Sequence, residues 1–97
     1  MAEVTLVARF IAKPGKEAEL KTLLSSVVAT TNAEDGCKIY DLYESPGTGR
    51  FFFWELWESQ EALNAHSVSA HIKKMREHVG DLIAEPVELS PLKAVKG

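Results

Sequence analysis

The sequence predicts an α+β domain in which helices cover one face of a four-stranded antiparallel sheet. The chain has 97 residues, of which 45% are hydrophobic and 26% charged, as is typical of a single folded core. Apolar residues alternate with a period of two in some segments and recur at helical spacing in others. These segments follow one another as strand, helix, strand, strand, helix, strand. We therefore expect residues 1–97 to form one domain.

The first strand is expected over residues 4–12, where every second residue is apolar. Its other face is mixed and carries Arg9. Pro14-Gly15 ends this pattern and opens a helix, which stops at Asp35-Gly36. The apolar stripe of that helix is formed by Leu20, Leu23, Leu24, Val27, Val28 and Thr31.

Two strands joined by a short turn are expected next. Residues 37–45 form the first of them, and we place Tyr40 and Leu42 on opposite faces. Pro46-Gly47-Thr48-Gly49 has the length and composition of a hairpin turn. Residues 51–58 form the partner strand, which should also neighbour the first strand of the chain.

This third strand is apolar on both faces, which has a consequence for assembly. Phe52, Trp54 and Leu56 share one face, and Phe51, Phe53 and Trp57 share the other. Helices can cover only one of the two faces. A large exposed apolar patch usually marks an interface, and a second copy of the chain, packed sheet against sheet, is the simplest cover. We therefore expect a homodimer.

Two helices and a final strand complete the chain. Ser59 is expected to cap a short helix that ends near Ala65. A longer helix follows and ends at Glu85-Pro86, with an apolar stripe of Val68, Ile72, Met75, Val79 and Leu82. The last strand, residues 87–95, contains Pro91, which places it at a sheet edge. The complete order is the split βαβ, or ferredoxin-like, βαββαβ arrangement.

Composition and motifs exclude several classes of function. The net charge of −3 argues against a nucleic-acid partner, which would need clustered cations. No apolar run approaches the roughly 18–20 residues that span a bilayer, and no signal peptide is visible. Cys37 is the only cysteine, so no internal disulfide can form. We expect a cytoplasmic protein that binds neither nucleic acid nor a membrane.

A metal site is not expected from the spacing of the histidines. His66 and His71 are five residues apart, about 140° around a helix, so one continuous helix cannot direct both at one ion. No Cys-x-x-Cys or His-Glu-x-x-His motif is present.

Glu55 raises the main functional question, because it lies inside the most hydrophobic strand. One interpretation pairs it with Arg9 on the neighbouring strand. The other is a desolvated carboxylate with a raised pKa that accepts a proton from an organic acid or phenol. His71 lies at the edge of its helix's apolar stripe, and His66 turns inward if the chain direction resets near residue 67.

Four segments together resemble the antibiotic biosynthesis monooxygenase domain family, which includes quinol monooxygenase-like proteins and an autoinducer-processing isomerase. They are KPGKEAEL (residues 13–20), EDGCKIYDLYES (34–45), FFFWELWESQEALNAH (51–66) and SAHIKKM (69–75). The resemblance covers nearly the whole chain. It implies a dimer of ferredoxin-like subunits, each with a pocket between helices and sheet, and oxygenation of electron-rich aromatic substrates by O₂ without flavin, metal or haem. Members of the family vary in which polar residues do the catalysis; in this chain we expect His66 and His71 to transfer protons and Glu55 to act as an orienter or base. Trp57, Met75 and Phe53 are the expected substrate-lining residues.

Three functions follow from this resemblance and from the residues. The first is a cofactor-independent monooxygenase that acts on a quinol-like or polyphenolic small molecule. The second is an isomerase of a small phosphorylated metabolite, which needs an anion-binding group at the pocket mouth. Lys73, Lys74 and Arg76 are the candidates for that group. The third is a non-catalytic dimeric module that binds a small molecule without turnover.

Overall fold

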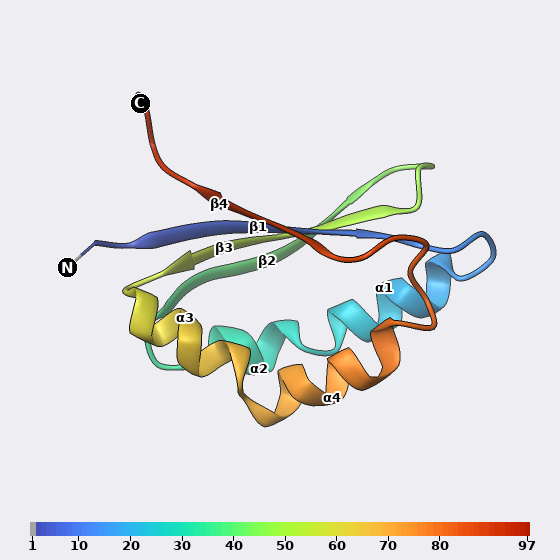
Figure 1. The fold of residues 1–97 in the computed structure, drawn as a ribbon, viewed down its shortest axis with the longest axis horizontal. Coiled ribbons are helices and arrows are strands. Elements are labelled where there is room, and N and C mark those ends of the chain that lie inside the picture. The colour runs from blue at the N-terminus through green and yellow to red at the C-terminus, as the bar shows by residue number, and fades with distance from the viewer. Residues whose placement is uncertain (1) are drawn as a thin grey trace.

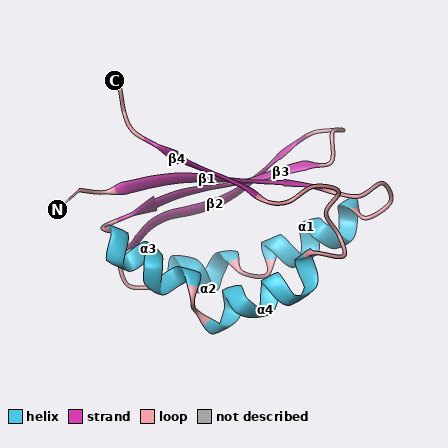
Figure 2. Cartoon of the chain, in the orientation of Figure 1, coloured by secondary structure: helices cyan, strands magenta, loops and turns pink. Residues whose placement is uncertain are grey.

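Residues 2–97 are described in a computed structural model, in which one antiparallel sheet carries helices on a single face (Figure 1, Figure 2). The strand order is β2-β3-β1-β4. The predicted ferredoxin-like fold is confirmed. Its elements are β1 (Val4–Ile11), α1 (Glu17–Ser25), α2 (Val28–Asn32), β2 (Cys37–Ser45), β3 (Arg50–Trp57), α3 (Gln60–Ser67), α4 (Ala70–Val79) and β4 (Glu88–Leu92).

The two central strands carry the alternation that the sequence predicts. β1 lies between β3 and β4 and is antiparallel to both. Its helix-facing side chains, Leu6, Ala8 and Phe10, are buried. Ala12 is buried as well, but it continues the strand only as an isolated bridge to Ile83.

The expected single helix before β2 is two helices, so that prediction is wrong in this detail. α1 ends at Ser25 and α2 begins at Val28. The Ser26 hydroxyl and the Ser26 backbone N–H both donate to the carbonyl of Leu23, at 2.6 and 3.2 Å. Such local serine bonds compete with the helical ladder, and β-branched Val27 and Val28 follow at once. The apolar stripe still faces the sheet, because Leu20, Leu24, Val27 and Thr31 are all buried.

On β2, the placement of Tyr40 and Leu42 on opposite faces is wrong. Residues two apart in a strand point the same way, and both side chains face the helices: Tyr40 is buried and Leu42 packs against the core. The predicted turn at residues 46–49 and the antiparallel pairing of β2 with β3 are confirmed.

The end of the chain differs from the prediction in where its elements stop. Ser59 caps α3 by accepting the Ala62 N–H at 3.2 Å, as expected. α4 stops at Val79, before Gly80, rather than at residue 85. The segment after it pairs with the end of β1 instead, since Ala84 donates to the Ile11 carbonyl at 2.8 Å. β4 is shorter than predicted and lies at the sheet edge, as Pro91 requires.

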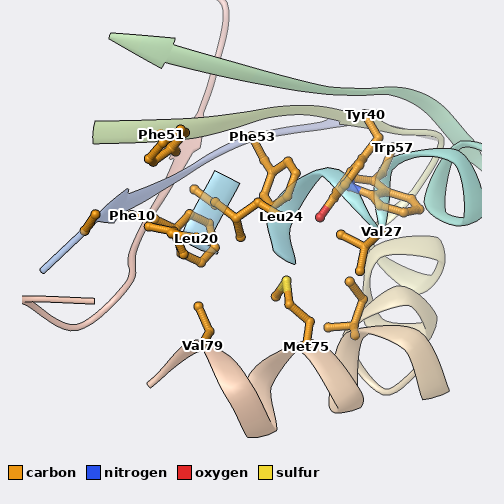
Figure 3. Packing of buried hydrophobic residues seen from close by; sticks show 13 residues of the cluster. Phe10, Leu20, Leu24, Val27, Tyr40, Phe51, Phe53, Trp57, Met75 and Val79 are labelled. Atoms are coloured by element: carbon orange, nitrogen blue, oxygen red, sulfur yellow. The ribbon is translucent and has the colours of Figure 1, made fainter. Parts of the chain in front are cut away.

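The core fills the space between the sheet and the helices (Figure 3). Aromatic side chains from the sheet form its upper layer: Tyr40 stacks on Phe53 with ring centroids 4.5 Å apart, and Phe10 meets Phe53 edge-on at 5.6 Å. Met75 and Val79 approach from α4 (Figure 3). Among the described residues, no helix is long and apolar enough to cross a membrane.

Candidate active site

A cavity of about 170 Å³ lies between the sheet and helices α3 and α4. Most of its wall is apolar, and a few polar side chains interrupt it. A larger groove of about 580 Å³ runs along edge strand β2, but it contains none of the predicted site residues. The smaller cavity is therefore the candidate site. Its lining is Leu6, Ala8, Phe10, Tyr40, Phe53, Glu55, Leu63, His66, Ser67, Ile72, Met75, Arg76, Val79, Val87 and Leu89.

Glu55 is the acidic side chain in this wall. The alternation along β3 places it on the helix-facing side, together with Phe53 and Trp57, where only 3% of its surface is exposed. One of its carboxylate oxygens accepts a hydrogen bond from the Trp57 indole N–H at 3.0 Å. No cation forms a salt bridge with it among residues 2–97.

The predicted pair between Glu55 and Arg9 is wrong. Arg9 lies opposite Phe52 in the β1–β3 register, so its side chain is on the open face of the sheet, away from Glu55. There it meets Glu85 and Glu88, at 3.8 and 3.6 Å. Within residues 2–97, Glu55 is thus left without a counter-charge.

Burial consequently raises the pKa of Glu55 from 4.5 to about 7. The Trp57 hydrogen bond acts in the opposite direction, because it stabilises the charged form, and the nearby Glu34 carboxylate adds to the rise. A carboxyl group with a pKa near neutral exchanges protons readily at physiological pH, as general acid–base catalysis requires.

His66 is the second titratable group in the wall, and Glu34 holds it in place. His66 is 6% exposed as a residue, and the Nδ1 of its imidazole lies 2.8 Å from a Glu34 oxygen. Its ring packs against Trp57, with centroids 4.6 Å apart. Burial lowers the pKa of His66, although Glu34 opposes that shift. Because a carboxylate only accepts hydrogen bonds, Nδ1 carries the proton of the neutral ring and Nε2 carries the lone pair.

His71 approaches the same carboxylate from the other side. Its Nε2 lies 2.9 Å from the Glu34 oxygen and 3.1 Å from the hydroxyl of the fully buried Thr31. His71 does not line the cavity, so it reaches the reaction space only through Glu34 and His66.

The structure also shows where the other predicted residues lie. Phe53 and Met75 line the cavity. Trp57 is fully buried behind the wall and contributes through its hydrogen bond to Glu55. The helical-wheel argument against convergence of His66 and His71 does not apply, because they belong to two helices, α3 and α4.

Glu34 is the residue that the sequence reasoning missed. It lies in the loop between α2 and β2, two residues before Gly36. That loop is fixed beside α3, because Cys37 pairs with Trp57 and the Glu58 N–H donates to the Gly36 carbonyl at 2.8 Å. The available signal was the Glu-Asp-Gly turn directly before a strand that pairs with β3.

The arrangement places two proton acceptors of different kinds in one apolar cavity. Glu55 has a raised pKa, and His66 is kept in one tautomer by Glu34. The rest of the wall is apolar and shields an aromatic ring from water over the surface that the ring contacts. Proton abstraction from a bound small molecule is the chemistry that this site supports.

Comparison with known proteins gives a consistent result. Residues 3–78 match the family described as antibiotic biosynthesis monooxygenase. The Mycobacterium tuberculosis protein named "Putative monooxygenase Rv0793" is 39% identical over 89 residues, which cover 92% of this chain and 88% of the relative. The solved structure of that protein superimposes on this chain with a TM-score of 0.92. The superposition covers 99% of this chain and 98% of the relative. The structure of PA3566 from Pseudomonas aeruginosa superimposes with a TM-score of 0.91 at 28% sequence identity. That superposition covers 99% of this chain and 97% of PA3566.

A third relative, named "Putative monooxygenase YcnE" and found in Bacillus subtilis, is 29% identical over 87 residues, or 89% of this chain and 92% of its own. The resemblance stated from the sequence segments is thereby confirmed. The match runs from β1 into α4 and includes Glu34, Glu55, His66 and His71. This chain belongs to the antibiotic biosynthesis monooxygenase family.

Proposed function

We propose that this protein is a monooxygenase that oxidises a small quinol-like aromatic compound with O₂ in the cavity between the sheet and helices α3 and α4. The observation that carries the proposal is the buried Glu55 carboxyl, with a pKa of about 7, in the wall of an otherwise apolar cavity. A phenol or hydroquinone needs such a group, because it must lose a proton before it reacts with O₂.

The size of the cavity favours a single ring. An apolar cavity of about 150 Å³ is large enough to hold benzene, and the present one measures about 170 Å³. Phe53 and Tyr40 offer aromatic faces beside it. A monocyclic hydroquinone is therefore a better fit than a tricyclic anthrone, although both are electron-rich.

The reaction needs no redox cofactor, because the substrate itself supplies the electrons. Glu55 or His66 takes a proton from a substrate hydroxyl, and the resulting anion transfers an electron to O₂. Recombination forms a carbon–oxygen bond, and cleavage of the O–O bond leaves one oxygen on the ring. A hydroquinone and one O₂ thus give a hydroxyquinone and one water, with four electrons moving from substrate to oxygen.

Oxygen consumption with a panel of substituted hydroquinones, and with anthrone for comparison, tests this proposal. We expect turnover of the monocyclic compounds, with kcat/KM rising as pH increases through about 7, because the Glu55 carboxyl must be ionised to act as a base. Glu55→Gln should lower kcat by about 10²–10⁴-fold, the usual contribution of a general base.

His78→Gln is the matched control for His66→Gln, because His78 is exposed on α4 and does not line the cavity. We expect the first variant to retain the wild-type rate and the second to lose most of it. Equal rates for wild type, Glu55→Gln and His66→Gln would contradict the proposed site. Ligand binding without oxygen consumption would favour the non-catalytic binding module instead.

Arg76 supports a second candidate function, the isomerisation of a small phosphorylated metabolite. Its side chain lines the cavity and one of its guanidinium nitrogens donates to the Ser67 carbonyl at 2.7 Å. The remaining donors could hold a phosphate at the mouth. Calorimetry with sugar phosphates distinguishes the two candidates: phosphate-competitive binding that is lost in Arg76→Gln supports the isomerase, and its absence in wild type excludes it.

A further inference from the structure

We propose that Glu34, His66 and His71 form a binding site for one divalent transition-metal ion of the zinc class. The three residues come from three separate parts of the fold: the loop before β2, helix α3 and helix α4. The proposed oxygenation uses no ion at this position, so the inference goes beyond that function. An ion on Nδ1 of His66 would move the proton of the neutral ring to Nε2 and leave Glu55 as the base of the cavity.

The geometry is already close to that of a metal site. One ligand atom from each residue lies within 4.8 Å of the other two. A Glu34 oxygen is 2.8 Å from Nδ1 of His66 and 2.9 Å from Nε2 of His71. In a tetrahedral zinc site the ligand atoms are about 3.4 Å apart. Both contacts would therefore open by only about half an ångström to admit an ion.

The ligand types select the class of ion. Two imidazole nitrogens and one carboxylate oxygen are the donor set of many catalytic zinc sites, and also of non-haem iron sites. Imidazole is a poor ligand for Mg²⁺ and Ca²⁺, which prefer oxygen. The set leaves at least one coordination position for water. Thr31, whose hydroxyl is 3.1 Å from Nε2 of His71, is placed to hydrogen-bond such a water.

An ion can reach the three side chains from solvent, and the surrounding structure holds them in place. The side chains of His66, Glu34 and His71 are 8%, 17% and 21% exposed, so the cluster is mostly enclosed but reachable from solvent. His66 is held by its packing on Trp57 and Tyr40. An ion at this point would tie together α3, α4 and the loop before β2, and we expect it to stabilise the fold.

Titration of the full chain with Zn²⁺ by calorimetry tests the proposal directly. We expect one ion per chain and an increase in Tm when Zn²⁺ is added, because an ion that binds only the folded state stabilises it. Co²⁺ bound in place of Zn²⁺ should give the visible absorption bands of a tetrahedral, four-coordinate ion. Glu34→Gln removes the charge of the carboxylate ligand and His71→Asn removes a ligand nitrogen, so each should weaken binding by at least about tenfold.

His78→Asn is the matched control, because it removes the one histidine outside the cluster and should leave the affinity unchanged. Circular dichroism without metal checks that the two ligand variants fold; both changes are at partly exposed side chains. The proposal is overturned if wild type shows no saturable binding, if the ligand variants bind as tightly as wild type, or if His78→Asn abolishes binding. These binding measurements test the metal site independently of whether the protein consumes oxygen.

Discussion

At the scale of single residues, Glu55 is held in a position where its charge costs stability. The residue is 3% exposed, and its carboxylate receives one hydrogen bond, from the Trp57 indole. A glutamine of the same shape could keep that hydrogen bond without carrying a charge. Retaining a titratable group at such a site is the kind of local cost that functional residues impose.

The pH dependence of stability gives the first prediction. The pKa of Glu55 is about 7 in the folded protein and 4.5 for an unperturbed carboxyl. Between these two values the folded state binds the extra proton, so this group's contribution to stability falls as pH rises. We expect Glu55→Gln to gain up to about 3 kcal/mol relative to wild type between pH 4.5 and 8.

Urea unfolding of both proteins across this pH range measures the effect. Glu77→Gln, at an exposed acidic position on α4, is the control for the loss of one carboxylate from the chain. A wild-type–Glu55→Gln difference that stays constant with pH would mean that this carboxyl titrates at its ordinary value.

At the scale of elements, the loop between α2 and β2 positions Glu34, and Gly36 determines its path. Gly36 has a φ of +80°, and a Cβ at this residue would lie 2.6 Å from the Cβ of Ala62 on α3. Only glycine permits both the left-handed backbone and this close approach. The loop can therefore bring Glu34 to His66 only with glycine at this position.

We predict that Gly36→Ala is more destabilising than Gly47→Ala. Gly47 also has a positive φ, +76°, but no atom lies within 4 Å of its would-be Cβ. Gly47→Ala thus incurs the backbone strain alone, about 1 kcal/mol, whereas Gly36→Ala adds a clash of about 1–3 kcal/mol. Chemical denaturation of the two variants tests this, and equal losses would contradict a specific contact between the loop and α3.

The sheet was the part of the fold that the sequence predicted best. Alternation was sufficient for the sheet, because Leu6, Ala8 and Phe10 follow a strict period of two that one register satisfies. It also placed Glu55 on the face shared with Phe53. It could not identify that face as the helix-facing one, because β3 is apolar on both sides.

The helix boundaries and the composition of the site were harder to predict from the sequence. The break at Ser26 arises from a side-chain bond to Leu23, and the early end of α4 at Gly80 from pairing of the next segment with β1. Neither alters the apolar periodicity that predicts helices. Glu34 joins His66 through a contact across 32 sequence positions, and such contacts follow from the fold as a whole rather than from any local pattern.

At the scale of the whole molecule, the open face of the sheet remains apolar. Val7, Tyr43, Phe52 and Trp54 surround a shallow hollow on it, and Trp54 and Tyr43 are 40% and 56% exposed. The helices cover only the opposite face (Figure 1). The chain after β4 extends away from the sheet on this uncovered side (Figure 1), where it could contact a second subunit.

The cavity gives a further reason to propose a dimer. Leu89, on edge strand β4, lines the cavity and is 61% exposed. The wall is therefore incompletely covered at this edge. A second subunit packed over the open face and the neighbouring edge would bury the apolar patch and help to keep water from Glu55. Oxygenation of a reactive anion depends on that exclusion of water.

We therefore predict that Trp54→Glu converts a dimer into a monomer. Size-exclusion chromatography with light scattering should give wild type a mass near twice the chain mass of 10.7 kDa, and the variant a mass near 10.7 kDa. A charge at the centre of an apolar interface opposes association because it would have to be desolvated. Thr22→Glu, which adds the same charge at an exposed position on α1, should remain dimeric. A wild-type mass near 10.7 kDa at micromolar concentration would rule out the dimer, and the open face would then need another partner.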